Sequence, residues 1–270
     1  MKKFAKILVA VLCLALVIAL GCVTLVACDK DDANTLKVAT NCEFDPFEML
    51  DDNGNPTGID MDIMAAIAKE LGMKLKISDM LFDSVVGSVG SGTCDVAAAG
   101  LTVDVERLET VDFTKSYFKS NQVVIAKTGD EILSLTDADA VVAMLEGKRL
   151  GAQKGTTGYK FISGDSDLYD GIKDAEAVGY DSGALAVDAL KNGQIDYVVI
   201  DAVPAAKLAE TNSGVVVSSV ILTDEDYAFA VKKGNKELLD KINAALDKLI
   251  ANGTIEQIFQ KYGLTSGLTA

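Results

Sequence analysis

Residues 94–107 read CDVAAAGLTVDVER, and the order of residue types in this stretch predicts a strand, a tight turn and the start of a helix. The apolar run is short, as expected of a buried strand, and it ends in three residues with almost no side chain, at 98–100. Such residues leave backbone N–H groups open to close approach. Because Thr102 and Arg107 follow, we interpret the stretch as a candidate anion site, with a strand-to-helix turn bearing a surface arginine as the alternative.

The same alternation of strand and helix continues along the chain. Ile63, Ile67 and Leu71 are spaced as on one face of a helix, with Asp60 or Asp62 as its cap. The predicted strands are 35–40, 74–78, 94–100, 111–118, 122–127, 148–153, 175–180, 195–201, 215–221 and 227–233, and the predicted helices are 59–73, 83–92, 155–162, 181–193, 202–210 and 236–263, the last divided at Asn252 and Gly253. This alternation predicts parallel sheets covered by helices on both faces, which is the α/β class.

The composition excludes several classes of function. The chain contains no histidine and no tryptophan, which removes Ser-His-Asp and Cys-His catalysis and histidine-ligated zinc. Its formal net charge of −15 leaves no basic face for nucleic acid. With 49% hydrophobic residues, the 270-residue chain can bury the core of one large domain or two ordinary ones. We predict neither a metal site nor a cofactor.

The N-terminus has the features of an export signal. MKKFAK is positively charged, residues 7–27 are apolar or small, and LVAC at 25–28 is followed at once by DKDDAN. An apolar residue shortly before the cleavage point and a cysteine just after it resemble a lipobox, the signal for bacterial lipoprotein processing. We predict a signal peptide at 1–27, lipidation of Cys28 with palmitate, a tether at 28–35 and an extracytoplasmic protein that lipid holds at the cell membrane. The alternatives are an uncleaved membrane helix and cleavage before Cys22.

Two further cysteines, Cys42 and Cys94, would remain in the mature protein. In an extracytoplasmic protein such a pair suggests a disulfide. However, Cys42 follows the C-terminal end of one predicted strand, whereas Cys94 stands at the N-terminal start of a parallel one. Those ends would lie too far apart for the Cα separation of about 5.5 Å that a bridge needs, so we predict two free thiols.

Chemically distinct residues follow four predicted strands, at the edge where open α/β sheets bind ligands. They are Asn41 and Phe44 after 35–40; Gly100, Thr102 and Arg107 after the strand in 94–100; Gln153, Gly155, Thr156 and Thr157 after 148–153; and Asp201 after 195–200. A carboxylate would suit Arg107 and the hydroxyls, and an ammonium would suit Asp201. Because a zwitterion is costly to desolvate unless both charges are met, this inventory predicts a site for the common part of an α-amino acid. Each residue alone could instead be a surface residue, a helix cap or part of the core.

Eight stretches of the chain, taken together, resemble those of one family. They are EFDPFEM (43–49), GIDMDIMAAIAKELG (58–72), FDSVV (82–86), DVAAAGLTVDVER (95–107), VDFTKSYF (111–118), GAQKGTTG (151–158), KNGQIDYVVID (191–201) and NGTIEQIFQKYG (252–263). In this order they are similar to the solute-binding proteins of polar amino-acid ABC importers, bacterial extracellular solute-binding family 3, which have the periplasmic-binding-protein type II fold. The resemblance extends from about residue 36 to residue 263.

The resemblance implies two α/β lobes with a ligand cleft between them and two crossovers. Lobe 1 would comprise 36–122 and 227–270, and lobe 2 would comprise 123–226. The implied ligand-binding residues are Asn41, Phe44, Asp60, Phe82, Ala99, Gly100, Thr102, Arg107, Gln153, Thr156, Thr157 and Asp201. Arg107 and Thr102 would hold the α-carboxylate with the 156–157 region, and Asp201 would hold the α-amino group with Gly100. Phe44 and Phe82 would sandwich the side chain.

The implied mechanism is capture by lobe closure. Because the two charge-pairing residues are on different lobes, only the closed form would pair both charges of the ligand, and the ligand would shift the balance toward that form. A membrane permease and its ATPase would recognise the closed form. We expect the protein itself to be a monomer.

Departures from the family pattern leave the ligand open. Where relatives that take cationic amino acids often place Asp, this chain has Asn41, although Glu43 and Asp60 could supply negative charge near the side chain. Gly87 and Gly90 loosen the helix that would position Phe82. We predict a polar L-amino acid, with glutamine, arginine, lysine, histidine and cystine all open.

The rival functions are an enzyme of the same fold, such as a dehydratase or lytic transglycosylase, a ligand-sensing receptor component and a structural surface lipoprotein. Without a histidine base, we predict no enzyme.

Overall fold

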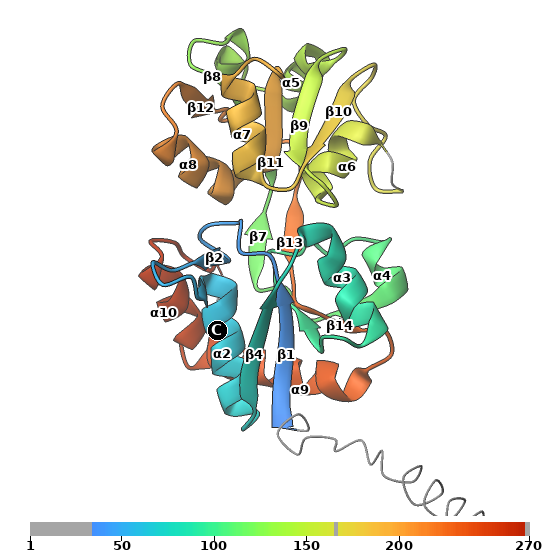
Figure 1. The fold of residues 1–270 in the computed structure, drawn as a ribbon, viewed down its shortest axis with the longest axis vertical. Coiled ribbons are helices and arrows are strands. Elements are labelled where there is room, and N and C mark those ends of the chain that lie inside the picture. Colours follow the sequence, from blue (N-terminus) through green and yellow to red (C-terminus); the bar gives the residue numbers. More distant parts are fainter. Residues whose placement is uncertain (1–33, 165–166, 268–270) are drawn as a thin grey trace, which may run out of the picture. The chain divides into compact units, whose positions relative to one another are not determined.

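Two five-stranded sheets carry the fold in the computed structural model, which describes residues 34–164 and 167–267 (Figure 1). The strand order is β4-β1-β5-β14-β6 in the first sheet and β10-β9-β11-β8-β12 in the second. The strands are β1 (Thr35–Thr40), β2 (Met49–Leu50), β3 (Pro56–Thr57), β4 (Lys74–Asp79), β5 (Val96–Ala97), β6 (Val111–Phe113), β7 (Phe118–Ser120), β8 (Gln122–Lys127), β9 (Arg149–Gln153), β10 (Glu176–Tyr180), β11 (Tyr197–Asp201), β12 (Val215–Val217), β13 (Glu225–Tyr227) and β14 (Ala230–Lys232). The helices are α2 (Ile59–Glu70), α3 (Phe82–Ser91), α4 (Arg107–Thr110), the 3₁₀ helix η2 (Glu131–Ser134), α5 (Ala138–Leu145), α6 (Thr157–Ser163), α7 (Gly183–Lys191), α8 (Ala202–Thr211), α9 (Lys236–Ala251) and α10 (Thr254–Lys261). The predicted α/β class with two sheet-containing lobes is confirmed.

The predicted signal peptide at 1–27 and the lipidated Cys28 lie outside the described residues. Most of the predicted tether, 28–35, also lies outside the described residues. β1 begins at Thr35, which is the last residue of that predicted tether. We call the part built on the first sheet lobe 1 and the part built on the second sheet lobe 2. The boundaries predicted after residues 122 and 226 stay a prediction, although Gln122 already begins β8 of the second sheet.

Both sheets are mixed, whereas the alternation of strands and helices predicted parallel ones. β1 runs parallel to β5, and β9 runs parallel to both β10 and β11. In contrast, β14 is antiparallel to β5 and β6, and β8 is antiparallel to β11 and β12. The parallel expectation is therefore wrong for one internal strand of each sheet.

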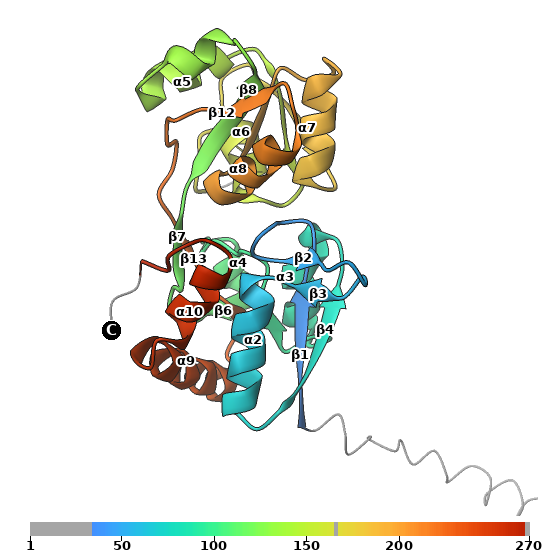
Figure 2. The same cartoon turned by 90° about the vertical axis from the view of Figure 1, so that its left-hand side faces the viewer.

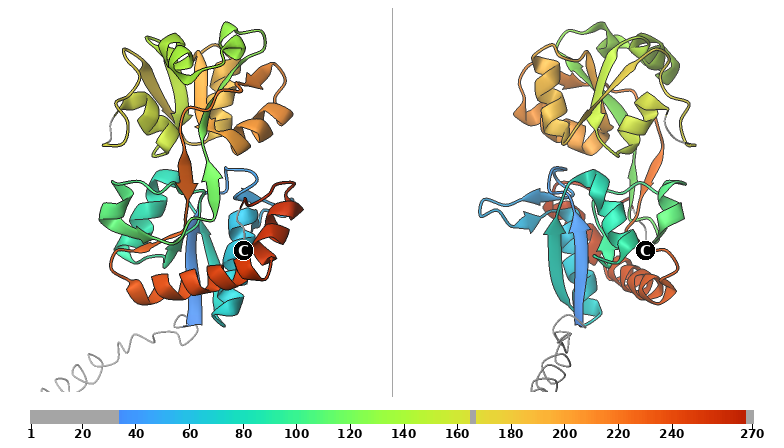
Figure 3. Two further views of the ribbon diagram at one scale, coloured as in Figure 1. Left: turned by 180° about the vertical axis from the view of Figure 1, so that it is seen from behind. Right: turned by 45° about the vertical axis from the view of Figure 1, so that its right-hand side comes forward.

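The two reversed strands are those that enter a sheet from the other lobe. The chain leaves lobe 1 through β7 into β8 and returns through β13 into β14, and β7 and β13 pair side by side (Figures 1 and 3). Their antiparallel register places Ser120 opposite Glu225 and Phe118 opposite Tyr227. Because both crossovers arrive at the end where the parallel strands finish, β8 and β14 must run in the opposite direction.

Helices cover both faces of each sheet, as Figure 2 shows for the second sheet. Along β8, Val123 and Ile125 pack in the apolar core that contains α7, whereas Val124 and Ala126 pack in the core that contains α5 and α6. Side chains alternate between the faces of a strand, so a strand covered on both sides is apolar at every position. This burial on both faces explains the continuous apolar run VVIA at 123–126.

The start of α2 differs from the predicted cap. The N-cap is Gly58, at φ 126°, and a Cβ there would lie 2.3 Å from the carbonyl oxygen of Phe47. The loop before the helix is therefore packed too closely for a side chain. The predicted caps, Asp60 and Asp62, are wrong, because both lie inside the first turn and the Asp60 side chain is turned into the interior.

The periodic patterns in the sequence did not predict several short elements correctly. The sequence predicted neither η2 nor α5 nor the β2–β3 hairpin. The helix start expected within 94–107 is present, but α4 is only four residues long. The strand predicted over 94–100 is reduced to β5, because Gly100 turns the backbone at φ 51°. Cys42 and Cys94 lie buried beyond opposite ends of β1 and β5, and both thiols are free, as predicted.

Phe229 offers a test of the core of lobe 1. It is fully buried and its ring stacks on Tyr117 at 4.3 Å between centroids. We expect Phe229→Ala to lower the free energy of unfolding by about 3–5 kcal/mol, because it leaves a cavity. Ile221→Ala, at a side chain that is 57% exposed, should change it by less than about 0.5 kcal/mol. Urea unfolding followed by circular dichroism would measure both, and an equal effect of the two variants would contradict the packing described.

Candidate functional site

Residues that follow the strands of both lobes meet where the parallel strands end. Gln153, the last residue of β9, donates from Nε2 to Asn41 Oδ1 at 2.8 Å. Arg107 donates from Nη2 to the carbonyl oxygen of Gly155 at 3.0 Å. The predicted residues of lobe 1 and lobe 2 are thus in hydrogen-bond contact in this structure.

Arg107 is a buried cation with neutral partners. It is 7% exposed, and Nη1 donates to the carbonyl oxygen of Thr102 at 2.8 Å. Among the described residues, its hydrogen bonds go only to backbone carbonyls, and no carboxylate forms an ion pair with it. Burial lowers the pKa of Arg107, whereas the charges of Asp104 and Glu225 raise it. A buried guanidinium held this way can form a charge-assisted, two-point contact with an anion.

A buried carboxylate, that of Glu225, joins the hydroxyls of Thr102 and Thr157. Its Oε2 accepts hydrogen bonds from Thr102 Oγ1 at 2.6 Å and from Thr157 Oγ1 at 3.0 Å. Glu225 is 3% exposed and begins β13, one of the two crossover strands. One carboxylate therefore bridges a residue of lobe 1 and a residue of lobe 2.

Asp201 ends β11 and is 4% exposed. It is the N-cap residue of α8, but its side chain makes no capping hydrogen bond and instead accepts from Ser120 Oγ at 2.9 Å and from the Tyr227 hydroxyl. Burial, together with the charge of Glu225, raises the pKa of Asp201 to about 7, although the hydrogen bonds from Tyr227 and Ser120 lower it. A cation beside Asp201 would favour its ionised form and pair with it.

A second acidic pair, Glu48 and Asp60, lies behind Gly100. Asp60 accepts hydrogen bonds from the Gly100 backbone N–H at 3.0 Å and from the Tyr117 hydroxyl at 2.6 Å. Burial raises the pKa of Asp60 to about 6, and burial together with the Asp60 charge raises that of Glu48 well above its usual range. Glu48 therefore binds a proton more readily than an exposed glutamate does. Asp60 supports the backbone turn at Gly100.

Two phenylalanines border the region. A Cβ on Gly100 would lie 2.9 Å from Phe44 Cε1, so only glycine allows this approach. The ring of Phe82, at the start of α3, lies 5.6 Å from the guanidinium carbon of Arg107. Gly90 lets α3 pack against α4, since a Cβ there would lie 2.3 Å from a methyl group of that helix. The predicted sandwiching of a ligand side chain between Phe44 and Phe82 stays a prediction.

An ion-pair cluster joins the lobes beside Arg107. Lys160 of α6 contacts Asp104 Oδ2 at 2.7 Å and Glu106 Oε2 at 2.6 Å. Burial would raise the pKa of Asp104, but the hydrogen bond from Lys160 and the charge of Arg107 outweigh it and lower that pKa. The cluster fixes α6 of lobe 2 against the turn that precedes α4 of lobe 1.

Three other predicted residues are engaged within the protein. Thr156 caps α6, accepting from the Tyr159 backbone N–H at 3.2 Å and donating to the Gln153 carbonyl oxygen at 2.7 Å. The Ala99 methyl lies in the apolar cluster with α3. Asn41 donates from Nδ2 to a backbone carbonyl at 2.9 Å. Their roles toward a ligand stay predictions.

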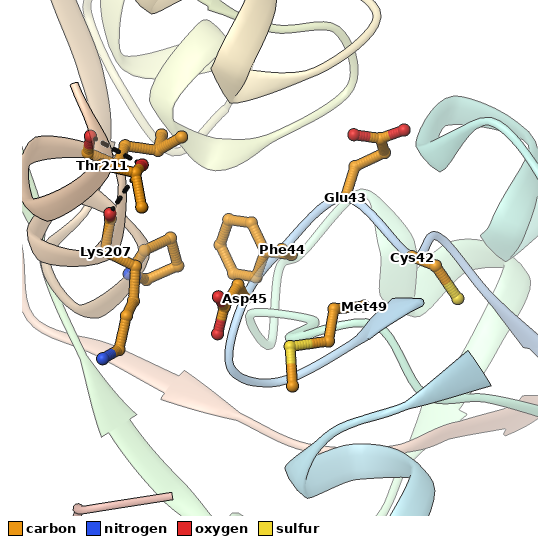
Figure 4. A pocket seen from close by; sticks show the side chains of 9 residues that line it. Cys42, Glu43, Phe44, Asp45, Met49, Lys207 and Thr211 are labelled. Carbon is orange, nitrogen blue, oxygen red and sulfur yellow. Dashed lines mark hydrogen bonds between the residues drawn. The ribbon is translucent and has the colours of Figure 1, made fainter. Parts of the chain in front are cut away.

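A pocket of about 190 Å³ lies beside Phe44, between the 42–49 loop and α8 (Figure 4). It is lined by Cys42, Glu43, Phe44, Asp45, Met49, Pro204, Lys207, Leu208 and Thr211. In the close-up, Phe44 extends from the loop toward α8, which carries Lys207 and Thr211. Phe44 therefore separates this pocket from the turn at Gly100.

Sequence reasoning missed Ser120, Glu225 and Tyr227, which all lie on the crossover strands. Glu225 stands among three acids in TDEDY, and nothing in that run marks one acid as buried. Only the pairing of β7 with β13 places these side chains beside Asp201 and the threonines. Glu48 was missed for a similar reason, since its burial depends on the packing of its loop against the start of α2.

In residues 34–164 and 167–267, no group of three or more cysteine, aspartate or glutamate side chains is arranged to hold a metal ion. In the same ranges, no helix is both long and apolar enough to cross a bilayer.

Comparison with known proteins gives consistent likenesses. Residues 36–265 match the model of the bacterial extracellular solute-binding proteins, family 3. ABC transporter arginine-binding protein 1 of Escherichia coli strain K12 is 31% identical over 235 residues, which cover 85% of this chain and 91% of that protein.

Solved structures agree with this match. The holo form of ArgBP from T. maritima has a TM-score of 0.71 and 36% identity, covering 81% of this chain and 91% of its own. An ancestral arginine-binding protein bound to glutamine has a TM-score of 0.75 and 35% identity, covering 85% of this chain and 97% of its own. The likeness in sequence and the likeness in fold therefore both cover most of the chain.

Proposed function

Because the chain belongs to the bacterial extracellular solute-binding proteins, family 3, we propose that it captures a polar L-amino acid and delivers it to the permease of an ABC transporter. An extracytoplasmic location is part of this proposal, and membership of a family of extracellular proteins supports it. Two of the proteins compared above are named as arginine-binding proteins, one of them as part of an ABC transporter, and we propose no catalytic activity for this chain.

The single observation that carries the proposal is the presence of a buried cation on one lobe and a buried acid on the other, neither of them in an ion pair among the described residues. Arg107 of lobe 1 has only carbonyl partners among the described residues, so it can bind the α-carboxylate. Asp201 of lobe 2 can bind the α-ammonium. An amino acid meets both needs at once, and neither of its charges would be buried unpaired.

Lobe closure follows from this division of charges. Contacts between the lobes, such as Gln153 with Asn41 and Lys160 with Asp104, form in the arrangement described. A ligand held by Arg107 and Asp201 adds to those contacts only when the lobes are together, so it shifts the population toward the closed form. We propose that the permease recognises the closed form.

The side chain of the ligand is proposed only as a class. Asn41 and Asp60 supply an amide and a carboxylate to the region, and Phe44 and Phe82 supply apolar walls. Glu43 lines the pocket beside Phe44. These groups suit a polar side chain with an apolar stem. Arginine and glutamine are the first ligands to test, because an ancestral arginine-binding protein similar to this chain has been solved bound to each of them.

We also propose that Cys28 carries the lipid anchor and that residues 1–27 are removed. The support is the sequence LVAC followed by an acidic, polar stretch. Lipid would then hold the protein near its permease, and the folded part would act as a monomer.

Calorimetric titration with arginine, glutamine, lysine, histidine and cystine tests the function. We expect one of them to bind with a Kd near 1 μM, worth about −8 kcal/mol. Arg107→Ala and Asp201→Asn should each weaken binding at least about 100-fold, since each leaves one ligand charge buried and unpaired. Arg149→Ala is the matched control, because Arg149 pairs with Asp196 at the opposite end of β9 and should not affect binding. Tight binding by Arg107→Ala would overturn the carboxylate assignment, and no binding by the wild type would overturn the function.

Binding should also depend on pH through Asp201. Its pKa of about 7, raised by burial and then by Glu225, means that acid below pH 7 protonates the group that must pair with the ammonium. We expect affinity to fall about tenfold from pH 8 to pH 6, with uptake of a proton on ligand release. Titrations near pH 7 in two buffers of different ionisation enthalpy would count that proton. Equal affinity at pH 6 and pH 8 would rule out an ionised Asp201 as the ammonium partner.

The anchor has its own test. Cells expressing the full chain would be labelled with radioactive palmitate, and we expect the label in the wild type and in Cys22→Ala but not in Cys28→Ala. The cysteine that accepts lipid is the one directly after the cleavage point, so the two variants should differ. Label retained by Cys28→Ala and lost by Cys22→Ala would move the cleavage site to Cys22.

A further inference from the structure

The hydroxyls assigned to the ligand carboxylate already bind a carboxylate of the chain. Glu225 Oε2 lies 2.6 Å from Thr102 Oγ1 and 3.0 Å from Thr157 Oγ1. A threonine hydroxyl has a single proton to donate. Thr157 Oγ1 also accepts a hydrogen bond from Gln122 Nε2 at 3.1 Å, so its one proton points to Glu225.

A second carboxylate cannot share these donors with Glu225. It would find both hydroxyl protons in use, and it would face a like charge in a site from which water is largely excluded. The ligand carboxylate must then either do without Thr102 and Thr157 or take them from Glu225.

We propose that Glu225 is a built-in competitor for the α-carboxylate, which the ligand displaces from Thr102 and Thr157 when it binds Arg107. The inference rests on the proposed function and names a residue that sets the affinity of the same site. Glu225 thereby keeps binding weaker than the donors of the site alone would allow.

Displacement is feasible because Glu225 has other partners. Its Oε1 accepts hydrogen bonds from Thr223 Oγ1 at 2.8 Å and from the Tyr169 hydroxyl at 3.4 Å. The side chain can keep these donors while Oε2 leaves the other two. Glu225 stands opposite Ser120 in the β7–β13 pair, so the exchange takes place on a strand that connects the lobes.

The opposing view makes Glu225 a support that orients the two hydroxyls toward the ligand. The two roles predict opposite signs when Glu225 is removed. A competitor weakens binding of carboxylate ligands, so its loss tightens binding, whereas loss of a support weakens it.

The test is calorimetric titration of Glu225→Ala and Glu225→Gln. The ligand is whichever of arginine, glutamine, lysine, histidine or cystine the wild type binds most tightly, used both as the free acid and as its α-carboxamide. Asp224→Ala and Asp224→Asn are the matched controls, because Asp224 is the exposed neighbour of Glu225 and its substitution removes the same charge. Circular dichroism melts of all four variants would check that they fold.

We expect Glu225→Ala to bind the free acid about tenfold more tightly than the wild type, as for one regained charge-assisted hydrogen bond. The carboxamide should not bind more tightly, and the Asp224 controls should match the wild type. If Glu225→Ala does not fold, Glu225→Gln decides the question with a smaller gain, because an amide oxygen is a weaker acceptor than a carboxylate.

Weaker or unchanged binding of the free acid by folded Glu225 variants would overturn the competitor role and leave the proposed function standing. An equal gain for the carboxamide would overturn it too, since the effect would not depend on the ligand carboxylate. Absence of binding in the wild type as well as the variants would instead refute the proposed function, and the competitor role with it.

Discussion

The double passage of the chain between the two sheets is the constraint on which the site depends. β7 carries the chain out of lobe 1 and β13 brings it back, and the two strands pair with Ser120 opposite Glu225. This pairing reverses β8 and β14 within otherwise parallel sheets. It also places Ser120, Glu225 and Tyr227 where the parallel strands of both lobes end, so the crossovers supply side chains to the site as well as a connection between lobes.

The site holds several charges whose partners are incomplete within the described residues. Arg107 is buried with carbonyl partners, and Asp201 is buried with two hydroxyl donors. Burial raises the pKa of Asp201 to about 7, so the protein holds this acid near the midpoint of its titration at neutral pH. A zwitterionic ligand held as we propose would stabilise both groups together, so the charges of the site suit an amino acid better than a singly charged solute.

Much of the fold was predictable because strand and helix periods are local properties. The spacing of Ile63, Ile67 and Leu71 predicted α2, and the break at Asn252 and Gly253 predicted the division of α9 from α10. The predicted caps of α2 were wrong, because close packing of Gly58 on the Phe47 carbonyl sets where that helix begins. The direction of β8 and β14 was also wrong, since it depends on the path between lobes and not on either strand.

The sequence by itself predicted the α/β class and the strand ends near Arg107, Thr102 and Asp201, because these follow from residue order and local periodicity. The family was indicated by the resemblance of eight stretches of the chain, which the match over residues 36–265 confirms. The sequence also correctly excluded a disulfide between Cys42 and Cys94, since strand direction alone separates them. Only the tertiary structure showed that Glu225 occupies the threonine hydroxyls, that Asp60 supports the turn at Gly100, and that Asp201 binds Tyr227 rather than capping α8. These contacts join residues up to 123 positions apart, and hydrogen bonds of that kind depend on how the sheets are assembled, which no local pattern records.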